Sequence, residues 1–431
     1  MRRFSMHDKA RSEQQGLRVA QWTAFWLTIL AYMVSFFHRV APAALSMELQ
    51  QAFSATSTEL GSVTAVFFFV VMAMQIPTGI IADTLGPRRL LVAGCMMAAL
   101  GAFVFASAHT VGIACIGRGF IGLGAAIPFV ALLRLNASWF SSRQFATLSG
   151  LTLLFGNLGS ILSTTPLQMA SQVVSWRLII GGIGVLTLAA GALIALYVRD
   201  KPSDLGLAHP DGPSSTATAA TRGSWVRQLL AVVTNARTWP CFWVGFGICG
   251  TFFTFTSLWA VPYLVQAVGL TKSEASTHVL VMILCHAVTA LFLGRTSDRL
   301  GNRKGLLLML AAIYLVSWLP MLGPMKTFAG ESYIVFAIQG IASTSYTLIW
   351  AIAKEVNAPD SAGMAIGVTN TSMFMAAAIF QPLIGALIDR FGLQGMTYSI
   401  ELLAAVSAIG LLAGLCLVET RGKNVYSQKI A

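Results

Sequence analysis

Twelve apolar stretches, each close to the length that crosses a bilayer, constrain the fold of this chain more than any other feature. Hydrophobic residues make up 56% of the chain and charged residues only 10%, whereas about 25% of a soluble domain is charged. Inside lipid a backbone must satisfy its own hydrogen bonds, so stretches of this length are predicted to be helices. They cover about residues 20–44, 59–82, 88–108, 111–133, 145–168, 176–198, 239–267, 276–294, 305–323, 332–353, 363–388 and 396–418.

A charged segment between the second and third stretches recurs between the eighth and ninth. Gly79, Asp83, Gly86, Arg88 and Arg89 are matched, 215 positions later, by Gly294, Asp298, Gly301, Arg303 and Lys304. Because this offset is half of the 431 residues, the chain is interpreted as two tandem halves. We therefore predict an all-α membrane protein with twelve transmembrane helices in two pseudo-symmetric six-helix bundles.

The polar segments divide the chain into five parts. We expect an N-terminal tail at 1–19, a first bundle at 20–198, a linker at 199–238, a second bundle at 239–418 and a C-terminal tail at 419–431. The linker contains few large apolar residues, which is typical of flexible segments. Its end, from Trp225 to Arg237, is predicted to form a short amphipathic helix on the membrane surface.

The basic residues indicate the orientation in the membrane. With a cytoplasmic N-terminus, 22 of the 28 Lys and Arg residues fall on the cytoplasmic side, which is the expected bias of membrane proteins. The net charge of +12 is therefore interpreted as a topology signal, and no nucleic-acid partner is expected. We predict a multi-pass protein of a bacterial inner membrane, monomeric, with both termini in the cytoplasm.

No catalytic pattern is visible in the sequence. The six cysteines lie in apolar stretches without metal-type spacing, and no phosphate-binding Gly-rich loop is present. The first 18 residues also lack the features of a cleavable signal peptide. We expect a protein that is not an enzyme and that needs no metal or cofactor.

The motifs together resemble the major facilitator superfamily over essentially the whole chain. The segments from Gly79 and from Gly294 look like its two loop motifs, Arg118 with Gly122 and Gly124 is similar to its helix-four motif, and Glu419-Thr420-Arg421 resembles its acidic close after helix twelve. The resemblance implies a central substrate cavity and alternating access by rocking of the bundles.

The ten residues of the duplicated segment are predicted to control this conformational change. Asp83 could face the N-terminus of a helix in the other half, where the helix dipole favours a negative charge. Arg88 and Arg89 could pair with cytoplasmic acids, and such contacts would close the cytoplasmic side. The alternative for the basic residues is that they only set the topology.

Polar residues inside the membrane are candidates for substrate binding, because they are costly there. Arg39 can hold a carboxylate or phosphate through two parallel hydrogen bonds, and we expect Tyr32 and Ser35 on the same helix face. Arg118, Asn157, Gln339 and Asn370 complete the predicted binding set. The alternatives are snorkelling of Arg39 to the outer interface, a structural strut at Arg118, and helix–helix hydrogen bonds for the amides.

Three residues are candidates for proton coupling. His38 and His286 carry side chains that titrate near physiological pH, and Glu401 is the one acid that lies well inside a predicted span. A histidine in this position can instead be a packing residue.

The charges favour an anionic substrate, because the first half has no carboxylate in the middle of a span. The stretch around Arg39 and the segment from Arg199 to Leu207 resemble family branches that move organic phosphates or small carboxylates. Thr251 to Trp259 lacks the second arginine of organophosphate antiporters. We predict a secondary active transporter, a proton-coupled uptake carrier for a small organic anion, in particular a carboxylate. The alternatives are a dipeptide or amino-acid carrier, a siderophore or drug exporter, and a sensor that binds without transport.

Overall fold

The first half of the chain forms nine α-helices in six membrane-crossing positions. The computed structural model describes residues 2–207, 225–322 and 332–427, without the side chains of residues 2–14, 83, 142, 143 and 145–147. The helices are α1 (Arg2–Ala44), α2 (Ser46–Phe53), α3 (Ser57–Leu85), α4 (Pro87–Ala106), α5 (Val111–Ala125), α6 (Pro128–Trp139), α7 (Ser142–Leu162), α8 (Thr165–Val173) and α9 (Trp176–Tyr197), followed by the 3-10 turn η1 (Pro202–Leu205).

The second half repeats this order after the linker helix α10 (Trp225–Thr234). Its seventh crossing alternates α and π segments: η2 (Ala236–Thr238), α11 (Trp239–Val244), η3 (Gly245–Gly250), α12 (Thr251–Thr254), η4 (Phe255–Trp259), α13 (Ala260–Tyr263) and η5 (Leu264–Val268). The remaining crossings are α14 (Lys272–Leu300), α15 (Arg303–Val316) with α16 (Leu319–Leu322), α17 (Ser332–Ser343) with η7 (Thr344–Tyr346) and α18 (Thr347–Glu355), η8 (Pro359–Ser361) with α19 (Ala362–Phe391), and α20 (Leu393–Leu415).

The predicted spans agree with these helices. Eleven of the described crossings are long and apolar enough to span a membrane, and α7 with α8 occupies the fifth position. None of the described residues forms a β-strand. The predicted helix near 225–237 is present as α10, and the expected tail before residue 20 continues α1 as helix from Arg2. The linker residues 208–224 lie outside the described residues.

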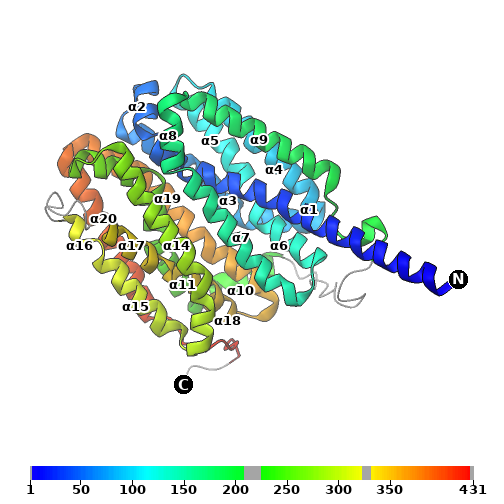
Figure 1. The fold of residues 1–431 in the computed structure, drawn as a ribbon. Coiled ribbons are helices and arrows are strands. Elements are labelled where there is room, and N and C mark those ends of the chain that lie inside the picture. The colour runs from blue at the N-terminus through cyan, green and yellow to red at the C-terminus, as the bar shows by residue number, and fades with distance from the viewer. Residues whose placement is uncertain (1, 208–224, 323–331, 428–431) are drawn as a thin grey trace.

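Two antiparallel helices, α3 and α19, form the main contact between the bundles, which Figure 1 shows side by side. Their backbones come so close that a Cβ atom on Gly61 would lie 2.4 Å from the carbonyl oxygen of Gln381. A Cβ atom on Gly385 would lie 2.3 Å from the carbonyl oxygen of Ser57. Only glycine allows this approach, which is a common means of tight helix packing in membranes.

A carboxylate of the second bundle caps the first bundle at the end of the molecule away from the termini. Asp389, near the end of α19, accepts hydrogen bonds of 2.8 Å from the backbone N–H groups of Ser57 and Thr58, and one of 2.6 Å from the Thr58 hydroxyl. These N–H groups open α3, so they have no partner within that helix and carry its positive dipole end. An ion pair between Glu48 and Lys272 joins the bundles at the same end. We call these contacts the Asp389 latch.

Asp389→Ala is expected to loosen this closed end. The loss of a helix cap costs about 1–2 kcal/mol, enough to shift the equilibrium between closed and open forms about fivefold to thirtyfold. Pulsed electron paramagnetic resonance between labels at exposed positions 51 and 273 should show a new population at longer distance. The matched control is Asp360→Ala, because Asp360 is exposed at the opposite end of the same crossing. An unchanged distance distribution in Asp389→Ala would contradict the latch.

Candidate functional site

A central cavity lies between the two bundles and takes side chains from both. Its walls come from α1, α3, α5, α6 and α7 of the first bundle and from α12, η4, α14, η7, α18 and α19 of the second. Helices α4, α9, α15 and α20 contribute none of the lining residues. The cavity holds about 1030 Å³, including the part open to solvent, which is enough for a small organic molecule.

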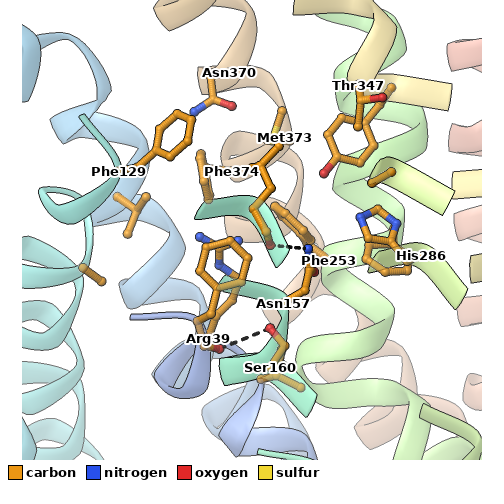
Figure 2. A pocket seen from close by; sticks show the side chains of 18 of the residues that line it. Arg39, Phe129, Asn157, Ser160, Phe253, His286, Thr347, Asn370, Met373 and Phe374 are labelled. Carbon is orange, nitrogen blue, oxygen red and sulfur yellow. Dashed lines mark hydrogen bonds between the residues drawn. The ribbon is translucent and has the colours of Figure 1, made fainter. Parts of the chain in front are cut away.

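Arg39 of α1 projects into this cavity, as Figure 2 shows. Its side chain is 9% exposed, and its Nε atom has no hydrogen-bond partner among the described residues. Three aromatic rings surround the guanidinium, with centroids 4.2 Å away for Phe36, 4.9 Å for Phe253 and 5.4 Å for Phe374. The ring faces stabilise a cation, but they leave its hydrogen-bond donors available for an anion.

Neutral polar groups complete the walls around Arg39. Tyr32 and Asn157 line the cavity from α1 and α7, and Asn157 donates to the carbonyl oxygen of Leu153 at 3.0 Å. Asn370 of α19 donates to Gln75 of α3 at 2.5 Å, so this hydrogen bond connects the two bundles. The predicted residues Arg39, Tyr32, Asn157 and Asn370 are therefore brought together.

The cavity carries one fixed charge. Among the described residues that line it, Arg39 is the only Arg or Lys, and no Asp or Glu is present. An unpaired guanidinium in a largely apolar cavity attracts anions and repels cations.

His286 of α14 lines the same cavity from the second bundle. Its ring is stacked on Phe252, with centroids 4.6 Å apart, and on Tyr346, with centroids 5.8 Å apart. Its Nδ1 atom lies 2.8 Å from the Ser343 hydroxyl, which itself donates to the carbonyl oxygen of Gly340. Because the hydroxyl hydrogen is used, Nδ1 is the donor to Ser343, and Nε2 is the nitrogen that can gain a proton.

The other predicted substrate and proton residues do not line the cavity. Arg118 is 1% exposed, donates to the carbonyl oxygen of His38 at 2.8 Å and lies 4.7 Å from the Phe67 ring centroid. His38 and Ser35 face a small pocket on the other side of α1. Gln339 is fully buried in α17, and Glu401 is exposed on α20.

Arg118 is therefore expected to support α1 rather than to bind substrate. In Arg118→Ala the free energy of unfolding should fall by about 2–3 kcal/mol, because a buried charged hydrogen bond is lost. Substrate Kd should change less than threefold. Thermal unfolding and ligand binding measured on the same preparation test this, with Arg118→Lys retaining part of the stability. A large loss of affinity without loss of stability would instead support direct substrate contact.

The first duplicated segment is attached within its own bundle. Asp200, which follows α9, accepts a hydrogen bond of 2.7 Å from the backbone N–H of Arg88 at the start of α4. Gly86 has a φ angle of +82°, and a Cβ atom there would lie 2.9 Å from the Asp200 carboxylate. The Arg88 guanidinium donates to the carbonyl oxygen of Ala195, and Gly79 accepts from Arg134 at 3.4 Å.

The second duplicated segment repeats this arrangement with different residues. Glu419, which follows α20, accepts hydrogen bonds from the backbone N–H groups of Arg303 at 3.2 Å and Lys304 at 2.7 Å. The Lys304 ammonium donates to the carbonyl oxygen of Leu415, as Arg88 does to Ala195. Arg303 also pairs with Asp298 at 3.0 Å and with Glu355 at 2.9 Å.

After Gly86 and Gly301, the residues of the two segments that occupy equivalent places in the structure differ by one position from those that match in the sequence. Gly86 alone joins α3 to α4, whereas Gly301 and Asn302 join α14 to α15. The residue equivalent to Lys304 is consequently Arg88, and Arg89 is exposed. Gly294 lies within α14 with open space beside it, and the side chain of Asp83 lies outside the described residues. A latch between the two halves at these segments stays a prediction.

Several residues that contact Arg39, His286 or the duplicated segments were not predicted from the sequence. Asp200 had a visible signal, because it follows the sixth crossing as Glu419 follows the twelfth. The aromatic residues Phe36, Phe253, Phe374 and Tyr346 had no such signal, since aromatic residues are common in every apolar stretch.

Glu419→Gln is expected to lower thermal stability at neutral pH. Although burial opposes it, the N–H donors of Arg421, Lys304 and Arg303 hold the pKa of the Glu419 carboxyl below its usual range. A lowered pKa means that the carboxylate stabilises the folded protein at high pH and that this contribution is lost as the pH falls through the folded-state pKa. The difference in melting temperature between wild type and Glu419→Gln should therefore shrink below about pH 4.3, the ordinary glutamate pKa.

The control for this measurement is Asp360→Asn, since Asp360 is exposed in the short turn η8. It should leave the melting temperature unchanged over the same pH range. A pH-independent difference for Glu419→Gln would show that the carboxylate charge is not what stabilises the start of α15.

Comparison with known proteins identifies the family. The model of the Major Facilitator Superfamily matches residues 24–260 and 242–429. The chain belongs to the major facilitator superfamily. It is thus a multi-pass membrane transporter by family, and not an enzyme, and the predicted twelve-helix fold in two bundles is confirmed.

Relatives within the superfamily have similar length. The "Probable sulfoacetate transporter SauU" of Cupriavidus necator is 23% identical over 407 residues, covering 90% of this chain and 91% of that one. The "Glycerol-3-phosphate transporter" of Bacillus subtilis is 22% identical, with 80% and 81% covered. The "Membrane sensor protein UhpC" of Escherichia coli is 22% identical, with 90% of each chain covered.

Solved structures of the superfamily have the same fold. A D-xylose-proton symporter superposes with a TM-score of 0.72 at 13% identity, covering 94% of this chain and 99% of that one. A bacterial homolog of the human lysosomal transporter Spinster, in an inward-facing and unoccupied conformation, has a TM-score of 0.69 at 15% identity, covering 92% and 97%. At these identities the similarity concerns the fold alone.

Proposed function

We propose that the protein is a proton-coupled uptake carrier for a small organic anion, in particular a carboxylate. The observation that carries this proposal is Arg39, a buried cation in the central cavity that faces aromatic rings and no carboxylate among the described lining residues. A bound anion would supply the negative charge that Arg39 lacks and would accept hydrogen bonds from its guanidinium. Cationic substrates would gain nothing from such a cavity.

The named relatives support an anionic substrate. Sulfoacetate, tartrate, glycerol 3-phosphate and galactarate or D-glucarate, which appear in the names of relatives, all carry acidic groups. Zwitterionic peptides and organic cations fit less well, because the described lining residues include no acid to hold an ammonium group.

We further infer that the protein lies in a bacterial inner membrane, as a monomer with both termini in the cytoplasm. The excess of basic residues on the side of the termini supports this orientation. In that orientation the Asp389 latch would close the periplasmic side, as expected for an inward-facing or occluded state. Protons are assigned to His286, because it is the one histidine among the described lining residues.

A second candidate function is a sensor that binds an anion without moving it. It is favoured by the similarity over 90% of the chain to the "Membrane sensor protein UhpC". Both functions require the same binding site, and only the translocation step distinguishes them.

Uptake into liposomes with an imposed pH gradient tests the proposal. Radiolabelled sulfoacetate, tartrate, glycerol 3-phosphate, a dipeptide and an organic cation form the panel. At least one anion should accumulate, and Arg39→Gln should raise its Kd about tenfold to a hundredfold, as expected for the loss of a charged hydrogen bond of about 1.5–3 kcal/mol.

The matched control is Arg227→Gln, because Arg227 is exposed on α10 and remote from the cavity lining. It should retain wild-type affinity. Accumulation of the cation alone, or normal anion affinity in Arg39→Gln, would refute the proposal. Anion binding without any uptake would identify the sensor instead.

A further inference from the structure

The cavity offers one permanent cation and one group that can become a cation, and these belong to different bundles. Arg39 comes from α1 of the first bundle, and His286 comes from α14 of the second. In Figure 2 the Phe253 side chain stands between the guanidinium and the imidazole. Phe253 contacts Arg39 while its neighbour Phe252 stacks on His286, so two adjacent residues of α12 contact the two groups.

The imidazole has a single edge left for a ligand. Phe252 and Tyr346 stack on the ring, and Nδ1 is hydrogen-bonded to Ser343. The ring is only 4% exposed although it lines the cavity. The edge that contains Nε2 is therefore the part that can meet a molecule in the cavity.

Few other charges can act on this imidazole. Tyrosines and thiols are neutral near pH 7, so Arg39 is the one permanently charged side chain among the described residues that line the cavity with His286. On α14 itself the titratable or charged residues are Lys272, Glu274, His278, Cys285, Arg295, Asp298 and Arg299, and the nearest charged ones along the helix, Arg295 and Glu274, are nine and twelve positions from His286. The described elements that pack against α14 add Tyr263 of α13, Arg303, Lys304 and Tyr314 of α15, Tyr333 of α17, Tyr346 of η7, and Lys354 and Glu355 of α18.

We propose that the cavity is a two-point site for dianions, in which Arg39 binds one acidic group and His286, protonated at Nε2, binds the second. This inference rests on the proposed function and specifies its substrate class and proton stoichiometry. Binding of a dianion takes one proton from solution onto Nε2, whereas a monoanion on Arg39 needs none. Proton uptake therefore depends on the charge of the substrate.

The arrangement also explains how binding could be linked to closure. A dianion that bridges Arg39 and His286 connects the two bundles through charged hydrogen bonds, which are about twice as strong as neutral ones. Without the second acidic group, or without the proton, that connection is missing. Closure around the substrate is thereby favoured when dianion and proton are both present.

Calorimetry with two probes of similar size tests the two-point site. Sulfoacetate carries a sulfonate and a carboxylate, and isethionate carries a sulfonate and a hydroxyl. Titrations of the full-length protein between pH 6 and 8, in buffers of different ionisation enthalpy, report both Kd and protons taken up. Sulfoacetate should bind with uptake of up to one proton, and its Kd should rise with pH by up to about tenfold per unit. Isethionate should bind with a Kd that is independent of pH.

Two variants separate this inference from the proposed function. His286→Gln should lose the pH dependence and proton uptake for sulfoacetate while it keeps isethionate binding, which also demonstrates a folded site. His278→Gln is the matched control, since His278 lies on the same helix outside the cavity lining, and it should behave as wild type.

The possible failures differ in meaning. Sulfoacetate binding that depends on Arg39 but not on pH would overturn the two-point site and leave the anion carrier intact. Equal pH dependence for both probes would also overturn it. Binding of neither probe, or binding unaffected by Arg39→Gln, would overturn the proposed function together with this inference.

Discussion

The close approach of α3 and α19 is the constraint on which the arrangement of the two bundles depends. Gly61 and Gly385 bring the backbones together, and the Asp389 carboxylate then reaches the first N–H groups of α3. Because the first N–H groups of a helix have no partner within that helix, this cap favours closure of one end of the interface. The cavity lies between the two bundles, and its wall includes residues of both helices. The Asn370–Gln75 bond, farther along the same helix pair, connects that interface to the wall of the cavity.

The two halves repeat the contacts that hold each bundle together, but they contribute different residues to the cavity. In each half an acid after the last crossing caps the start of the third crossing of that half, with Asp200 and Glu419 in equivalent roles. A basic residue then reaches back to a carbonyl oxygen of that last crossing. The cavity has no such symmetry, because its guanidinium belongs to the first bundle and its imidazole to the second. A substrate with two unlike contacts can therefore bind in one orientation only.

The sequence predicted the spans, the repeat and the position of Arg39 because each depends on local pattern. Apolar length determines the spans, and Arg39 shares a helix face with Tyr32, which also lines the cavity. The positions of the Arg118 and His38 side chains could not be predicted in the same way. Arg118 lies in a glycine-rich helix that packs on several sides, and its partner is a backbone carbonyl of α1. The Asp389 latch joins residues more than 330 positions apart, so it exists only through tertiary structure.

The aromatic residues around Arg39 have a specific energetic consequence. A bare cation at this depth would be very costly, and the three rings lower that cost without neutralising the charge. A carboxylate in the same place would neutralise it and would compete with any anionic substrate. The aromatic rings thus lower the free-energy cost of burying the guanidinium when the cavity is empty. Most of the electrostatic free energy is still available to be gained when an anionic ligand binds. The rings of Phe252 and Tyr346 stack in the same way on His286, and in the proposed two-point site they would hold the imidazole in place for the second acidic group.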